Sequence, residues 1–214
     1  MMAGQAWRWL TLFLLGAYHG INPGMGWLFA VALGMQESSA RAVVRALLPI
    51  ACGHAMAIAF VLLVARLVQL VLPLHYVKIA VAAALVGLGL FRLLRSRHLA
   101  WGGMRVGFRD LAIWSFLMAS AHGAGLMVLP LVIGLGAVDA ASGDHMHMHA
   151  AQDPQTLIMA TLVHTAGYLV FTAALALVVY QKLGLALLRT AWFNLDRVWA
   201  IALITTGGLA LLVT

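Results

Sequence analysis

The sequence predicts an all-α integral membrane protein, with six transmembrane helices arranged as two inverted repeats of three. Three observations predict this class. Of the 214 residues, 64% are hydrophobic and 9% are charged, whereas soluble domains have about 45–50% apolar and about 25% charged residues. The apolar residues gather in six runs, each near the ~20 residues that cross a bilayer. Short histidine-containing sequences also recur, in the same order, in the two halves of the chain.

We expect a single membrane domain over residues 1–214, because six spans with short linkers leave no room for a soluble domain. The apolar runs cover approximately 7–33, 46–72, 76–96, 111–137, 156–180 and 196–214. Each run is expected to be a helix, since a lipid-exposed segment must satisfy its own backbone hydrogen bonds. We expect the first run to be a retained helix, because Arg8 is the only basic residue near its start and no small-residue cleavage site occurs before His19.

The charge pattern predicts an orientation. The formal charge is +7, and in a membrane protein such an excess indicates cytoplasmic loops more often than nucleic-acid binding. Linkers 1–2, 3–4 and 5–6 hold Arg41, Arg45, Arg92, Arg95, Arg97, Arg105, Arg109, Lys182, Arg189 and Arg197. Linker 4–5 has no Lys or Arg and holds Asp139, Asp144 and Asp153. We therefore expect a bacterial cytoplasmic (inner) membrane protein with both termini outside.

An internal repeat divides the chain into halves of about 7–96 and 111–214. Residues 13–20 (FLLGAYHG) resemble residues 116–123 (FLMASAHG), and the next span of each half has a histidine, His54 and His164. An odd number of spans per half forces the halves into opposite orientations. This is the plan of many transporters, whose binding site lies near the midplane between the repeats.

Four histidines, His19, His54, His122 and His164, fall inside the predicted spans. An ionisable residue in a membrane is a functional-site hypothesis by default, and imidazole is the commonest metal ligand. It suits zinc, copper, nickel, cobalt or iron. The repeated set therefore predicts an intramembrane metal site, although any one histidine can simply hydrogen-bond a neighbouring helix. The single cysteine excludes an internal disulfide and a CxxC redox pair.

The residues beside the histidines predict a broken helix. Pro23 lacks an N–H and clashes with the carbonyl of His19, so the first span should kink or break there. Freed carbonyls at such breaks are used for ion sites in transporters, and Asn22 offers a side-chain oxygen. The alternative is a structural kink. We take as supporting residues Asn22, Pro23, Gly24, Met25 and Cys52.

A polar loop over about 138–155 follows the fourth span. It contains Asp144 and then His145, Met146, His147, Met148 and His149. Imidazoles and thioethers suit copper, nickel or zinc, and Met favours Cu(I). We expect a metal-capture loop outside the membrane, with a plain polar loop as the alternative. His75 and His98 have no assigned role.

The segment His19-Gly20-Ile21-Asn22-Pro23-Gly24-Met25-Gly26 resembles the first-helix motif of nickel/cobalt efflux transporters of the NicO type. His54-Ala55-Met56-Ala57 fits the second helix of that family. These transporters belong to a wider group of small 3+3 membrane proteins with the LysE, TauE/SafE and DsbD/CcdA families. The resemblance implies transition-metal transport. Met25 stands where the family has a second histidine, and Asn22 where it often has an acidic residue.

The leading hypothesis is a transporter for a transition-metal ion (nickel, cobalt, copper or zinc). His19 and His122 would form the central site, with His54 and His164 as inner and outer relay ligands, and a periplasmic metal donor or acceptor as partner. One alternative is a membrane oxidoreductase or electron carrier with a permanent His-ligated metal or haem. Another is a proton-coupled carrier of an organic or sulfur anion.

Overall fold

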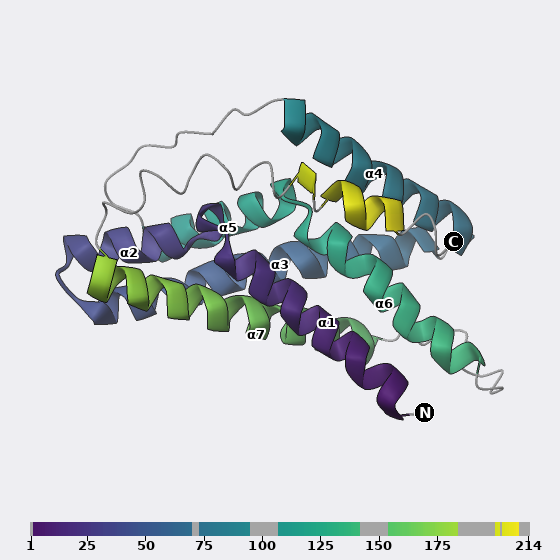
Figure 1. Cartoon of the computed structure of the whole chain (residues 1–214), viewed down its shortest axis with the longest axis horizontal. Helices are drawn as coiled ribbons and strands as arrows, with labels where there is room; N and C mark the ends of the chain where they lie inside the picture. Colours follow the sequence, from purple (N-terminus) through teal and green to yellow (C-terminus); the bar gives the residue numbers. More distant parts are fainter. Residues whose placement is uncertain are drawn as a thin grey trace.

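The computed structural model describes residues 2–69, 73–94, 107–141, 154–183, 200–201 and 203–209. These residues form helices and turns and contain no strand, which confirms the all-α class. Residues 200–201 and 203–209 are also helical. The elements in chain order (Figure 1) are α1 (Met2–Ile21), the 3₁₀ turn η1 (Pro23–Met25), α2 (Trp27–Gln36), α3 (Ala40–Gln69), α4 (Leu74–Leu94), α5 (Phe108–Ala121), α6 (Ala124–Ala141), α7 (Pro154–Val178) and the π-helical turn η3 (Val179–Leu183).

Two of the described helices are long and apolar enough to cross a membrane. They cover Ala40–Val68 and Pro154–Lys182, with mean hydropathies of 2.3 and 2.0. A third span is present if α5 and the start of α6, which are bent by 61° at their junction, count as one. The described helices therefore fit a membrane protein, as the composition predicted.

The outward faces of the long helices are apolar. Leu48, Met56 and Phe60 on α3 are 57–61% exposed, and Leu162 and Val170 on α7 are 56% and 54% exposed. Soluble monomers rarely expose apolar patches of this extent. Lipid tails would cover these side chains, so their exposure agrees with a membrane location.

The first apolar run is broken beside its histidine, as Pro23 predicted. Helix α1 ends at Ile21, and η1 separates it from α2. The Asn22 N–H donates to the carbonyl of His19 at 3.2 Å, and the Trp27 indole N–H donates to the carbonyl of Ile21 at 3.0 Å. Neighbouring groups thus satisfy the carbonyls that the break frees, as a buried break in a membrane requires.

The second half contains a break at the corresponding place. Helix α5 ends at Ala121, and His122 and Gly123 connect it to α6. Gly123 has a φ of +70°, a conformation that suits glycine. Both breaks therefore lie within a few residues of the repeat-related histidines His19 and His122.

Glycines bring three pairs of helices into close contact. A Cβ added to Gly16 or Gly167 would lie 1.9 or 2.1 Å from a carbonyl oxygen across the α1–α7 contact. One added to Gly53 would lie 2.1 Å from a carbonyl oxygen of α5. Gly89 of α4 and Gly207 of the helix at 203–209 face each other's helices at 2.7–3.0 Å. Figure 1 shows α1 beside α7, and α4 beside this last helix.

Candidate functional site

Three of the four predicted histidines meet in the interior. His19 comes from α1, His54 from α3 and His164 from α7, and each is 0% exposed. The ring centroids are 5.7 Å apart for His19 and His54, 5.0 Å for His19 and His164, and 5.5 Å for His54 and His164. We call this group the histidine triad.

Close helix packing explains why the triad forms. Gly16 lies one turn before His19, and without a Cβ it admits the backbone of α7 at His164. Gly167 does the same in the other direction, against Phe13 of α1. Small residues of this kind let membrane helices approach closely. Helix α3 packs on α7, which adds His54 to the pair.

A backbone hydrogen bond fixes the tautomer of His19. Its Nδ1 lies 2.8 Å from the carbonyl oxygen of Leu15. A carbonyl oxygen only accepts, so Nδ1 donates a hydrogen, and in neutral imidazole Nε2 then holds the lone pair. His122 makes the same bond, with Nδ1 donating to the Met118 carbonyl at 2.8 Å. Metal-binding histidines are commonly oriented by such a bond through their other nitrogen.

The other two members of the triad lack such a bond. Both ring nitrogens of His54 and of His164 are buried without a hydrogen-bond partner among the described residues. The Leu12 backbone lies beside the His164 ring but outside hydrogen-bonding geometry. An unsatisfied buried polar group costs about 1–3 kcal/mol. Four such atoms therefore lie in one small volume.

Tyr168 completes the site and was not predicted from the sequence. Its ring stacks on His54 with centroids 3.9 Å apart and planes 6° apart. Its hydroxyl donates to the carbonyl of Met25 in η1. Tyr168 therefore joins His54 to the break after α1. The available signal was its position four residues after His164, which places both side chains on one face of α7.

The separations within the triad suit a shared ion. A bond of about 2.1 Å to nitrogen puts each ring centroid about 3.2 Å from the metal, so rings on one ion lie about 5.2–5.5 Å apart. The triad spans 5.0–5.7 Å. The orientations differ, because His54 and His164 are stacked with planes 5° apart.

Consequently, among the residues that the structure describes, no group of three or more His, Cys, Asp or Glu is arranged to hold a metal ion. The lone pairs of stacked imidazoles lie in parallel planes and do not meet at one point. Rotation of the ring about the Cβ–Cγ bond has a broad energy minimum. The triad therefore has the spacing for an ion but not the orientation.

The grouping differs from the one predicted. His54 was assigned to an inner relay and His164 to an outer one, yet their rings stack 5.5 Å apart and both contact His19. The two rings meet because α3 and α7 pack together, with Tyr168 stacked on His54. His122, predicted beside His19, is 2% exposed at the break between α5 and α6.

Among the supporting residues, Asn22 and Pro23 shape the turn after α1. The Asn22 side-chain oxygen accepts from the Gly24 N–H at 2.8 Å and so caps η1, which begins at Pro23. Met25 is buried and Cys52 is exposed, away from the neighbouring His54. The loop residues His145, Met146, His147, Met148 and His149 lie outside the described part of the chain.

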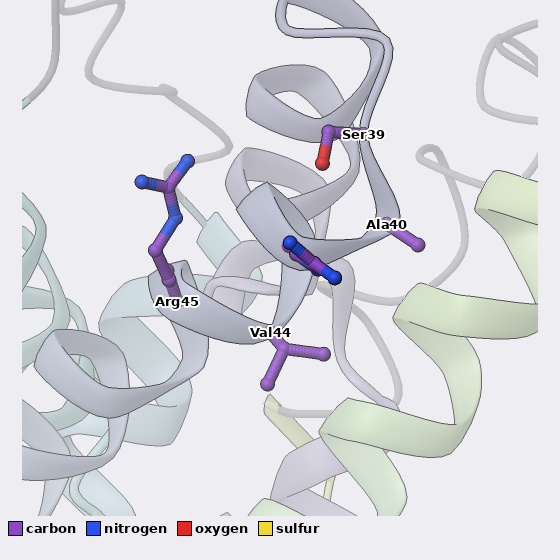
Figure 2. Close-up of a pocket in the computed structure, with 5 residues that line it drawn as sticks. Ser39, Ala40, Val44 and Arg45 are labelled. Atoms are coloured by element: carbon purple, nitrogen blue, oxygen red, sulfur yellow. The ribbon is translucent and has the colours of Figure 1, made fainter.

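A surface hollow of about 650 Å³ lies apart from these residues, at the corner between α2 and α3 (Figure 2). It is lined by Ser39, Ala40, Arg41, Val44 and Arg45. The Arg45 guanidinium is ion-paired with Glu37, and both side chains are more than half exposed. The hollow lies at the start of α3, in the region predicted as the basic 1–2 linker, and contains none of the predicted site residues.

Comparison with models of known protein families, with curated proteins and with solved structures finds no match for this chain. The resemblance to nickel/cobalt efflux transporters therefore stays a prediction from the sequence motifs.

Proposed function

We propose that this protein carries a transition-metal ion across the bacterial cytoplasmic membrane, with the histidine triad as the transport site. The observation that carries the proposal is the triad itself. Three imidazoles from three helices lie 5.0–5.7 Å apart, fully buried, and two of them have no hydrogen-bond partner among the described residues. An ionisable group inside a membrane is a functional-site hypothesis by default, and such groups mark ion pathways.

The architecture that we propose is six transmembrane helices in two inverted halves, with both termini outside. Helix packing supports it. In the proposed repeat, α1 of the first half corresponds to α5 of the second, and α3 corresponds to α7. The α1–α7 contact therefore corresponds to the α5–α3 contact, and glycines allow close approach in both. The third helices of the two halves, α4 and the helix at 203–209, correspond to each other and are in contact through Gly89 and Gly207. The bonds of His19 to Leu15 and of His122 to Met118 are likewise related by the repeat.

In this mechanism the ion is the cargo, and the chain supplies ligands and two hinges. The Leu15 carbonyl keeps Nε2 of His19 available to bind the ion, and His54 and His164 turn to complete the site. The breaks at η1 and at Gly123 are the points where each half bends. Bending there opens the triad to one side of the membrane or the other, as in transporters with discontinuous helices. His122 and the loop at 145–149 would bind the ion before or after the triad.

The test is metal flux in proteoliposomes containing the purified full-length protein. Nickel, cobalt, copper and zinc are each followed with an entrapped metal-sensitive dye. Wild type should transport at least one ion, whereas His19→Ala and His54→Ala should reduce that flux about tenfold or more. The matched control is His75→Ala, because His75 is exposed at the start of α4 and should leave flux unchanged. Absence of flux for all four metals refutes the proposal.

A second candidate is a membrane oxidoreductase or electron carrier with a permanently bound metal. Complete burial of the triad favours slow exchange and so supports it. A metal that purifies with the protein in a 1:1 ratio and survives chelation, without flux, would decide for this candidate. Haem ligation fits less well, because α1 and α7 are in backbone contact through Gly16 and Gly167. That contact leaves no gap for a porphyrin beside His19 and His164.

A further inference from the structure

The start of α3 holds two arginines beside the surface hollow of Figure 2. Arg41 and Arg45 line this hollow together with Ser39, Ala40 and Val44. Glu37, which is ion-paired with Arg45, is the single carboxylate within residues 34–48. Two arginines and one glutamate leave this corner with a net charge of +1, and all three side chains are exposed. The hollow is therefore a basic surface site.

An apolar stripe on the outer face of α3 begins at the same hollow. Every fourth residue from Val44 onward is exposed, which gives Val44, Leu48, Cys52, Met56 and Phe60. Positions four apart lie on one face of a helix, so these side chains form a continuous surface for lipid tails. In Figure 2 the Arg45 and Val44 side chains extend in opposite directions from the helix. Charge and hydrocarbon contact thus meet at one place.

The position of Arg45 along α3 matches the depth of a lipid headgroup. Residues 46–65 contain no Asp, Glu, Lys or Arg, and Arg66 follows them. At 1.5 Å per residue this uncharged stretch is about 30 Å long, which equals the ~30 Å hydrocarbon thickness of a bilayer. Arg45 and Arg66 therefore fit the two opposite headgroup layers, where long basic side chains reach the interface.

A phospholipid matches both parts of this surface. A guanidinium can donate two parallel hydrogen bonds to phosphate oxygens, and basic pockets between membrane helices bind anionic lipid headgroups. The acyl chains would then continue along Val44 and Leu48. The ion pair between Arg45 and Glu37 is exposed, and exposed pairs are weak, so a phosphate can replace the carboxylate. Free phosphate would use the arginines alone and leave the apolar stripe uncovered.

We propose that the hollow at the start of α3 binds the headgroup of an anionic phospholipid. Arg41 and Arg45 hold the phosphate, and an acyl chain lies along Val44 and Leu48. Lipid binding at this place depends on a membrane location and not on metal transport by the histidine triad, so either can fail without the other.

The experiment is a lipid titration of the purified full-length protein in detergent micelles, read by native mass spectrometry. Phosphatidylglycerol is the anionic probe, phosphatidylcholine is the zwitterionic lipid with the same chains, and glycerol 3-phosphate is a phosphate ester without chains. The measured quantity is the affinity that each variant loses relative to wild type, which removes the contribution of lipids bound at other basic segments.

The variants separate the hollow from general charge. Arg41→Gln with Arg45→Gln removes both cations, and the fold should tolerate it because the two side chains are exposed. Arg66→Gln, at the other end of the same helix, is the matched control. Glu37→Gln removes the carboxylate that competes for Arg45. Replacement of both arginines by lysine keeps the charge and loses the bidentate geometry, and it serves if the glutamine variant does not fold.

We expect the double glutamine variant to lose about 5-fold in phosphatidylglycerol affinity for each arginine, and so about 30-fold in all. Phosphatidylcholine binding and the Arg66→Gln variant should change little, the lysine variant should lose part of the affinity, and Glu37→Gln should bind at least as tightly as wild type.

Three results would overturn the lipid site. The first is wild-type phosphatidylglycerol affinity in the double glutamine variant, or in the lysine variant if that one is used. The second is an equal loss in Arg66→Gln, because any arginine at headgroup depth would then suffice. The third is binding of glycerol 3-phosphate with the affinity of phosphatidylglycerol, since the hollow would then accept a free phosphate ester and the apolar stripe would contribute nothing.

Discussion

Gly16→Ala tests whether backbone contact between α1 and α7 creates the triad. The added Cβ would lie 1.9 Å from the carbonyl oxygen of His164 and 2.9 Å from the backbone nitrogen of Tyr168. Neither atom can yield independently, because both belong to the α7 backbone. Since ordinary contact begins at 3.4 Å, the helices must separate by about 1.5 Å.

The magnitude follows from this displacement. Overpacking of this kind typically costs about 1–3 kcal/mol, and alanine returns about 0.5–1 kcal/mol by its better helix propensity. The net loss is therefore about 0–2.5 kcal/mol. Each kcal/mol lowers the melting temperature by roughly 2–4 °C for a chain of this size. A 1.5 Å separation also moves His19 away from His164, so metal affinity should fall at least tenfold.

The assay is thermal unfolding in detergent together with a titration of wild type and variant with the metal ion that wild type transports. Gly87→Ala is the matched control, since Gly87 lies on α4 with nothing within 4 Å of its added Cβ. It should keep full metal affinity and melt at the same temperature or slightly higher. If Gly16→Ala melts like Gly87→Ala and binds the ion normally, the contact between α1 and α7 does not position the triad.

Two further predictions concern the break after α1. Tyr168→Phe keeps the ring that stacks on His54 but loses the hydrogen bond to Met25. It should destabilise the protein by about 1–3 kcal/mol in thermal unfolding, because the Met25 carbonyl is left unsatisfied. The metal stoichiometry should stay unchanged. Loss of the bound ion instead would give the hydroxyl a direct role in binding. Asn22→Ala removes the side-chain cap of η1 and should cost about 1 kcal/mol in the same measurement, whereas Asn22→Asp should retain most of the stability. Equal melting of both Asn22 variants and wild type would show that the cap is dispensable.

The sequence determined the features that depend on neighbouring residues. The apolar runs are helical close to their predicted limits, as in α3 and α7, because a lipid-facing segment has few other ways to bond its backbone. Pro23 fixed the position of the first break by lacking an N–H. The capping role of Asn22 is equally local.

The tertiary structure decided which side chains meet. From the sequence, His19 paired with His122, because the repeat places them at matching positions in their helices. In the structure His19 meets His54 and His164, because Gly16 and Gly167 allow α1 to touch α7 and α3 packs on α7. The stacking of Tyr168 on His54 follows from that same contact. Spacing along a helix sets only the direction of a side chain, whereas the crossing of helices distant in sequence sets its neighbours.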